Sequence, residues 1–168
     1  MSGHGHHRGH DVRRVSCGVI TVSDTRTPED DTSGQRIRTL LSEAGHDVAS
    51  YQILKDQPEL IRTAIAEMPR AIEAVVLNGG TGLARRDMTY EAVQALLDKE
   101  ISGFGEMFRM LSYEQVGAAA MLSRAIAGVA ADRVLFSVPG STKAVELAMT
   151  KLILPEIGHI VGLIRGAQ

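Results

Sequence analysis

The chain has 168 residues, of which 44% are hydrophobic, and its formal net charge is −2. This length suits about one domain with its own apolar core, and so small a charge gives no electrostatic reason to expect nucleic acid or an anionic membrane as a partner. The lone cysteine, Cys17, excludes an internal disulfide. Because we find neither a signal-peptide pattern nor a run of about 18 apolar residues, we expect a cytoplasmic protein.

The first 14 residues differ from the rest in composition. They have no apolar stretch and place four histidines among glycines: His4, His6, His7 and His10. Histidines so closely spaced could bind Zn²⁺ or Ni²⁺, but a segment of such low hydrophobicity is typical of a disordered tail. We therefore predict a disordered tail over residues 1–14 and one folded domain over residues 15–168.

The first half of the domain alternates β-rich runs with helical segments. Strands are predicted over Ser16–Val22 and Val48–Leu54. Between them we interpret the acidic run 29–31 as a solvated loop. A helix is expected from near Gly34, where apolar residues recur at i, i+3, i+4 and i+7: Ile37, Leu40, Leu41 and Ala44. A second helix is expected from Pro58, because proline is favoured at the first helical position.

The middle of the chain begins with a third predicted strand over Ala74–Leu77. A glycine-rich loop, Gly79–Gly82, follows it directly, and Thr89 can cap the next helix. The segment 101–117, rich in methionine and phenylalanine, is predicted to be less regular.

The last part contains two further β-like runs, over 126–130 and 134–138. A helix is predicted over 142–154, with a last short helix after Pro155. Repeated strand–helix units are typical of a mainly parallel sheet covered by helices on both faces. The predicted fold class is therefore α/β, in one domain.

Candidate site residues collect in the loops that follow the strands. Right-handed crossovers place every strand-to-helix loop at the same edge of a parallel sheet, where ligands of open α/β sheets bind. The loops carry these candidates: Ser23, Asp24, Asp56, residues 79–87, Pro139, Gly140 and Ser141. Because neighbouring strands lie about 4.8 Å apart, Asp56 and Asp87 could share one cation. We expect an anionic, phosphorylated ligand with Mg²⁺ at this edge.

The loop 78–82, Asn-Gly-Gly-Thr-Gly, is the sharpest local feature. Its glycines permit positive φ and let backbone N–H groups approach an anion. The helix expected from Thr89 adds its positive end, and Arg85 and Arg86 offer bidentate phosphate contacts. A tight structural turn explains such a cluster equally well. The run 140–143 lacks the upstream glycine spacing of a Walker A loop.

Six motifs follow one another in order between Val15 and the C-terminus. They are Thr21-Val22-Ser23-Asp24, Asp31-Thr32-Ser33-Gly34, Gly79-Gly80-Thr81-Gly82 with Arg86-Asp87-Met88-Thr89, Gly103-Phe104-Gly105-Glu106, Leu122-Ser123-Arg124 and Pro139-Gly140-Ser141. This ordered set resembles the molybdopterin-binding MoaB/Mog family. The ending Leu154-Pro155-Glu156, with His159, is more similar to the MoaB branch than to the Mog branch.

The resemblance implies a three-layer α/β/α domain that assembles as a homotrimer or as a hexamer of two trimers. The implied reaction is adenylylation of molybdopterin, in which its terminal phosphate attacks the α-phosphorus of Mg-ATP and pyrophosphate is released. The chemistry is compatible with this site, because a phosphate monoester is largely ionised at neutral pH and needs no strong base.

The resemblance also implies roles for individual residues. Asp56 and Asp87 match two important aspartates of the family, which would organise Mg²⁺ and the triphosphate. Ser112 and Ser123 match serines that help to hold molybdopterin. The other matched positions would bind substrate or nucleotide: Ser23, Asp24, Gly79, Gly80, Thr81, Gly82, Arg86, Pro139, Gly140 and Ser141.

Two other functions remain open from the sequence. One is a non-catalytic oligomeric protein that carries or sequesters the pterin. The other is a related domain that hydrolyses nucleotide pyrophosphates. The first would retain pterin without turnover, and the second would consume nucleotide without any pterin.

Overall fold

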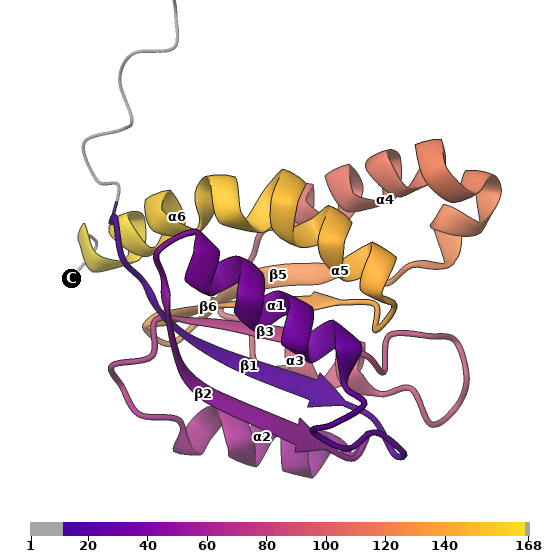
Figure 1. Cartoon of the computed structure of the whole chain (residues 1–168), viewed down its shortest axis with the longest axis horizontal. Coiled ribbons are helices and arrows are strands. Elements are labelled where there is room, and N and C mark those ends of the chain that lie inside the picture. The colour runs from indigo at the N-terminus through magenta and orange to yellow at the C-terminus, as the bar shows by residue number, and fades with distance from the viewer. Residues whose placement is uncertain (1–11, 167–168) are drawn as a thin grey trace, which may run out of the picture.

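The computed structural model describes residues 12–166, and this part of the chain forms a six-stranded sheet in the order β2-β1-β3-β6-β5-β4 (Figure 1). Four neighbouring strands are parallel: β2 (Asp47–Leu54), β1 (Ser16–Val22), β3 (Ala74–Asn78) and β6 (Arg133–Val138). β5 (Ile126–Ala130) pairs antiparallel with β6, and the short β4 (Lys99–Glu100) pairs antiparallel with β5. The predicted mainly parallel sheet is confirmed, and its four parallel strands end at one edge.

Side chains of the central strands alternate between two separate cores. On β1, Cys17 and Val19 belong to one apolar cluster, whereas Ile20 and Val22 belong to the other. All four are buried, because a parallel sheet that carries helices on both faces exposes neither face to water. The buried Cys17 thiol has its pKa raised by burial to about 12, which keeps it protonated at neutral pH.

Helices cover both faces of the sheet (Figure 1). One face carries α1 (Thr32–Glu43), α4 (Ser102–Val116) and a continuous C-terminal helix made of α5 (Thr142–Ala148), the π-helical turn η3 (Met149–Ile153) and α6 (Leu154–Gly166). The other face carries α2 (Pro58–Glu67) and α3 (Thr89–Gln94). The predicted three-layer α/β/α architecture is therefore confirmed.

The segment 101–117 is more regular than the sequence predicted. Its residues form the 15-residue helix α4, which buries Phe104, Phe108 and Ser112 at intervals of four. The opposite side of the helix exposes large apolar side chains: Met107, Met110, Tyr113 and Val116. Apolar residues on both sides of a helix hide the 3.6-residue period by which an amphipathic helix is recognised.

The C-terminal helix does not stop before Pro155. Pro155 follows the π-helical turn almost directly, and the helix continues through it without a break. By length and composition this one helix of the described residues, 142–166, could cross a membrane. Its apolar side is packed on the sheet instead, through these buried residues: Val145, Ala148, Met149, Leu152, Ile153, Ile157 and Val161.

The folded domain begins earlier than predicted. The Val12 N–H donates to the Gly158 carbonyl of α6 at 3.1 Å, and Arg14 Nε donates to Asp47 at 2.7 Å. Residues 12–14, which the sequence predicts to be part of the tail, are thus attached to the domain through Val12 and Arg14. The rest of the predicted tail, residues 1–11 with its histidines, lies outside the described residues.

Candidate functional site

Four loops meet where the parallel strands end, as the sequence predicted. The Ser23 N–H donates to the Leu54 carbonyl at 2.8 Å, which ties the loop after β1 to the end of β2. The Gly79 N–H donates to the Val138 carbonyl at 3.0 Å and ties the loop after β3 to the end of β6. Between η2 (Gly117–Leu122) and three of these loops, those after β1, β3 and β6, opens a hollow of about 580 Å³, which we call the rim pocket. Its lining residues are Thr21, Val22, Ser23, Arg26, Asn78, Gly79, Gly80, Thr81, Gly82, Ala119, Leu122, Ser123, Pro139, Gly140 and Ser141.

Most of the predicted binding residues line the rim pocket, and three do not. Asp24 lies beside it, where its carboxylate accepts a hydrogen bond from the Asp56 N–H at 3.3 Å. Ser112 is buried in a groove between α4 and α5 that meets the rim pocket at Ser141. Arg86 is exposed on the loop before α3 and is not part of the lining. The roles predicted for these residues stay predictions.

The glycine loop contains backbone N–H groups that no protein atom accepts within the described residues. Gly79 and Gly80 both have positive φ, +96° and +65°, a conformation that other residues rarely adopt. Within residues 12–166, no protein acceptor takes the N–H groups of Gly80, Thr81 and Gly82. Consecutive unpartnered N–H groups of this kind form a concave site that suits an anion.

The Asp56 carboxylate lies next to this loop, at Gly80. Its carboxylate accepts hydrogen bonds from the Met88 N–H at 3.1 and 3.2 Å and from the Thr89 hydroxyl at 3.4 Å. A Cβ added at Gly80 would lie only 2.3 Å from Asp56 Oδ2, so any larger residue at position 80 would clash with the Asp56 carboxylate. The start of the short helix α3, which we expected to face a bound anion, is therefore occupied by a carboxylate of the chain itself.

The Asp87 carboxylate lies close to the same loop at Gly82, two residues after the Gly80 contact of Asp56. A Cβ at Gly82 would lie 2.5 Å from Asp87 Oδ2. Burial raises the pKa of Asp56 above its usual value, and the negative charges of Asp87 and Asp24 raise it further against the opposing effect of the Met88 and Thr89 hydrogen bonds. Three acidic side chains thus act on one another here, an arrangement that a nearby cation would relieve.

The described residues contain no group of three or more His, Cys, Asp or Glu side chains arranged to hold a metal. A divalent cation beside Asp56 and Asp87 would therefore need further oxygen ligands from water or substrate. Mg²⁺ is commonly held in this way, through one or two carboxylates together with substrate phosphates.

Arg124 fixes the glycine loop from behind, a role that the sequence did not reveal. Its guanidinium donates to the carbonyl oxygens of Thr81 at 3.0 Å, Gly82 at 2.6 Å and Asp87 at 3.0 Å. It also pairs with Glu91. Because C=O and N–H point in opposite directions across a trans peptide, holding the Thr81 carbonyl directs the Gly82 N–H away from Arg124.

Glu29 and Asp30 are exposed, as expected of a solvated loop, but Asp31 is buried, which corrects our interpretation at that residue. Its carboxylate caps α1 by accepting the Gly34 N–H at 2.9 Å, and it accepts the hydroxyls of Thr21 and Tyr51 at 2.6 Å each. Burial opposes its ionisation, yet the hydrogen bonds from Thr21, Tyr51, Gly34 and Arg26 together hold its pKa below the usual value. The negative charge is therefore retained inside the domain.

Arg26 is the second functional candidate that the sequence did not single out. It lies in the loop after β1, lines the rim pocket, and donates through Nη1 to Asp31 at 3.2 Å and to Ser33 at 2.7 Å. Its position in a predicted site loop was available from the sequence. Its attachment to a buried carboxylate was not, because that depends on the folded path of the loop.

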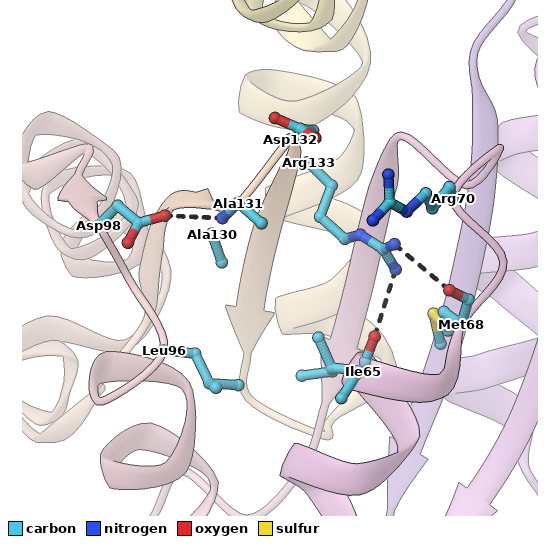
Figure 2. Close-up of a pocket in the computed structure, with 10 residues that line it drawn as sticks. Ile65, Met68, Arg70, Leu96, Asp98, Ala130, Ala131, Asp132 and Arg133 are labelled. Atoms are coloured by element: carbon cyan, nitrogen blue, oxygen red, sulfur yellow. Dashed lines mark hydrogen bonds between the residues drawn. The ribbon is translucent and has the colours of Figure 1, made fainter.

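A second hollow lies at the opposite end of the parallel strands, between the end of α2 and the β5–β6 turn (Figure 2). There Arg133 donates to the carbonyls of Ile65 and Met68 at 3.3 Å each, and Asp98 accepts the Ala131 N–H at 2.7 Å. Arg70 also lines this hollow. The contacts of Arg133 join the end of α2 to the sheet, so its donors already serve the fold.

Comparison with known proteins decides the family. Residues 18–159 match the family model described as a probable molybdopterin binding domain. The chain belongs to this molybdopterin-binding family. The match includes all four loops of the rim, from Ser23 to Ser141.

Relatives and solved structures place the chain within the MoaB/Mog family. It is 55% identical over 157 residues to molybdenum cofactor biosynthesis protein B of Bacillus cereus, covering 92% of this chain and 93% of that protein. The tungsten cofactor synthesizing protein MoaB from Pyrococcus furiosus is 40% identical, with a TM-score of 0.82 over 92% of this chain and 99% of that one. A structure of MogA is 25% identical, with a TM-score of 0.78 over 89% and 99%.

These comparisons confirm the predicted family and the similarity to the MoaB branch. They assign this MoaB/Mog family member a role in molybdenum cofactor biosynthesis.

Proposed function

We propose that the protein binds molybdopterin at the rim pocket and adenylylates it with Mg-ATP, releasing pyrophosphate. The observation that supports this most is the placement of Asp56 and Asp87 beside one loop, 80–82, whose N–H groups have no protein acceptor within the described residues. Carboxylates that hold a cation next to backbone N–H groups that bind phosphate are what a polyphosphate substrate requires.

In the proposed step, a terminal phosphate oxygen of molybdopterin forms a bond to the α-phosphorus of ATP. The bond between that phosphorus and the oxygen bridging to the β-phosphate breaks, and pyrophosphate leaves with the electron pair. The attacking phosphate is already largely a dianion at neutral pH, so the protein needs no strong base. The protein's part is to align two polyanions and to offset their charge.

Asp56 and Asp87 would hold Mg²⁺, which would neutralise charge on the triphosphate. The raised pKa of Asp56, caused first by burial and then by the neighbouring negative charges, supports this assignment because a cation would favour the ionised carboxylate. The N–H groups of Gly80, Thr81 and Gly82 would donate hydrogen bonds to phosphate oxygens, and the Arg124 contacts would keep the loop in place.

The pterin would extend from the rim pocket toward α4. Ser123 lines the pocket, and its buried Oγ has no hydrogen-bond partner within the described residues. Ser112 lies in the adjoining groove, which shares Ser141 with the rim pocket. The two serines would thus contact one ligand that spans both hollows.

We further propose that the protein acts in the cytoplasm as a homotrimer or as a hexamer of two trimers. The consecutive helices α4 and η2 expose these large apolar side chains: Met107, Met110, Tyr113, Val116, Met121 and Leu122. An apolar surface of this kind is typical of an interface between protein chains.

A non-catalytic oligomeric pterin-binding protein is the second candidate function. It is favoured by the hydrogen bonds of Asp56, whose oxygens already serve the start of α3. A carboxylate used in this way could be structural, with the rim pocket retaining pterin without turnover.

Measurement of pyrophosphate release separates these functions. An adenylyltransferase releases pyrophosphate only when molybdopterin, ATP and Mg²⁺ are all present. A binding protein retains the pterin and releases none, and a nucleotide pyrophosphatase consumes nucleotide without pterin. Either of the last two results would reject the proposed function.

A further inference from the structure

Arg26 is the only charged side chain that lines the rim pocket among the residues the structure describes. We propose that Arg26 binds a phosphate group of the ligand through the Nε and Nη2 edge of its guanidinium. The inference rests on the proposed function in one respect, namely that the rim pocket receives a phosphorylated ligand.

Hydrogen bonds to Ser33 and Asp31 hold the Arg26 guanidinium in place. Its Nη1 donates to Ser33 Oγ at 2.7 Å and to Asp31 Oδ1 at 3.2 Å. Asp31 itself is buried and is fixed by the hydroxyls of Thr21 and Tyr51. The anchor is therefore rigid, and Arg26 need not lose much side-chain freedom when a ligand binds.

The other edge of the guanidinium is almost unused. Nη2 makes one long contact, 3.5 Å to the Gly140 carbonyl, and Nε has no acceptor within residues 12–166. The Arg26 side chain keeps 31% of its surface accessible. Two parallel N–H donors on a planar edge match two oxygens of a phosphate, a geometry that a lysine ammonium does not provide.

The surroundings also favour an anion. No carboxylate is among the residues that line the rim pocket, and Asp31 shares its charge with several donors behind Arg26. The same pocket is also lined by Gly80, Thr81 and Gly82, whose N–H groups lack acceptors in the described chain. A phosphate placed between this loop and Arg26 would meet donors from both sides.

Binding of inorganic pyrophosphate by isothermal titration calorimetry tests the proposal, with no pterin and no turnover. We expect Arg26→Gln to weaken binding by about 10- to 100-fold, the range for loss of a charge-assisted contact. Arg26→Lys keeps the charge but not the planar edge, and should restore only part of the affinity. Arg70→Gln is the matched control, because it removes one positive charge at the opposite end of the sheet and should bind as the parent does.

Thermal unfolding of each variant shows whether it is folded. If Arg26→Gln does not fold, Arg26→Lys carries the test, and a loss of at least about 3-fold supports the proposal. Parent-like affinity in either folded Arg26 variant, or a parent protein that binds no pyrophosphate, would overturn it. Arg26-dependent binding without pyrophosphate release from ATP and molybdopterin would instead reject only the proposed adenylylation.

Discussion

The side chains of Asp56 and Asp87 both lie beside the glycine loop, Asp87 from the same loop and Asp56 from another part of the chain. A Cβ at Gly80 would lie 2.3 Å from the carboxylate of Asp56, and a Cβ at Gly82 would lie 2.5 Å from that of Asp87. Asp56 follows β2 and Asp87 follows β3, which are not the neighbouring strands that the sequence argument assumed, because β1 lies between them in the sheet. Two acidic groups are thus placed on a loop that offers N–H donors, and this pairing is the basis of the predictions below.

Replacement of Asp87 by Asn should lower turnover by at least about 100-fold while leaving pterin binding intact. The change removes the negative charge that would hold a cation at the reacting phosphate, and losses of this size follow removal of one electrostatic element. Pyrophosphate release and pterin binding are measured on the same preparation. Parent-like turnover in Asp87→Asn would show that the role assigned to Asp87 is wrong.

Replacement of Asp56 by Asn distinguishes a metal ligand from a stabilising cap. Because the pKa of Asp56 is raised, chiefly by burial, the folded protein binds this proton more tightly than the unfolded chain does. The free energy of unfolding should therefore fall as pH rises from the ordinary aspartate range, about 4, through the raised pKa. Asn removes this charge and can still accept the Met88 N–H, so the variant should be at least as stable as the parent at pH 7.

Unfolding measured from pH 4 to pH 7 with and without Mg²⁺ checks this prediction. The advantage of Asp56→Asn should shrink toward low pH, and Mg²⁺ should stabilise the parent but not the variant. A variant that is less stable than the parent at pH 7 and indifferent to pH would identify Asp56 as a cap alone.

Replacement of Gly80 by Ala should destabilise the protein by at least about 2 kcal/mol and abolish ligand binding. Gly80 has φ +65°, and its new Cβ would lie 2.1 Å from Thr89 Oγ1 as well as close to Asp56. Strain in the left-handed region and a steric clash both oppose the change. Urea unfolding gives the magnitude.

Gly45→Ala is the matched control for the backbone strain. Gly45 has φ +85°, and its Cβ would meet nothing within 4 Å. This variant should lose only the left-handed strain, about 1 kcal/mol, and should bind ligand normally. Equal losses in the two variants would mean that contact with Asp56 and Thr89 does not matter.

The oligomeric state can be tested by light scattering at micromolar concentration. We expect a trimer or a hexamer, because α4 and η2 expose apolar side chains that a partner chain would cover. Met110→Glu, on the exposed side of α4, should shift the assembly toward smaller species without changing the helix. A parent protein that is monomeric under these conditions would contradict the proposed assembly.

The meeting of the four loops was predictable because it depends on topology alone. Once β1, β2, β3 and β6 are recognised as parallel, their carboxyl ends share one edge, and Ser23, Asp56 and Gly79 must lie near one another. The strand limits were predictable within one residue for β1, β2 and β3, since buried β-rich runs end at polar or glycine-rich turns.

Other features depend on contacts that no local pattern encodes. From the sequence, Asp31 is an ordinary acidic loop residue; only in the fold do Thr21 and Tyr51, 10 and 20 residues away, donate to its carboxylate. Arg124 binds carbonyls about 40 residues away, and carbonyls carry no side-chain identity that the sequence could display. The helix α4 was obscured by apolar residues on both of its sides.

A crystal structure with bound Mg-ATP tests the central claim most directly. We predict Mg²⁺ about 2.1 Å from carboxylate oxygens of both Asp56 and Asp87, with the phosphates on the N–H groups of residues 80–82. A triphosphate bound elsewhere on the molecule, or a metal that contacts neither aspartate, would contradict the account.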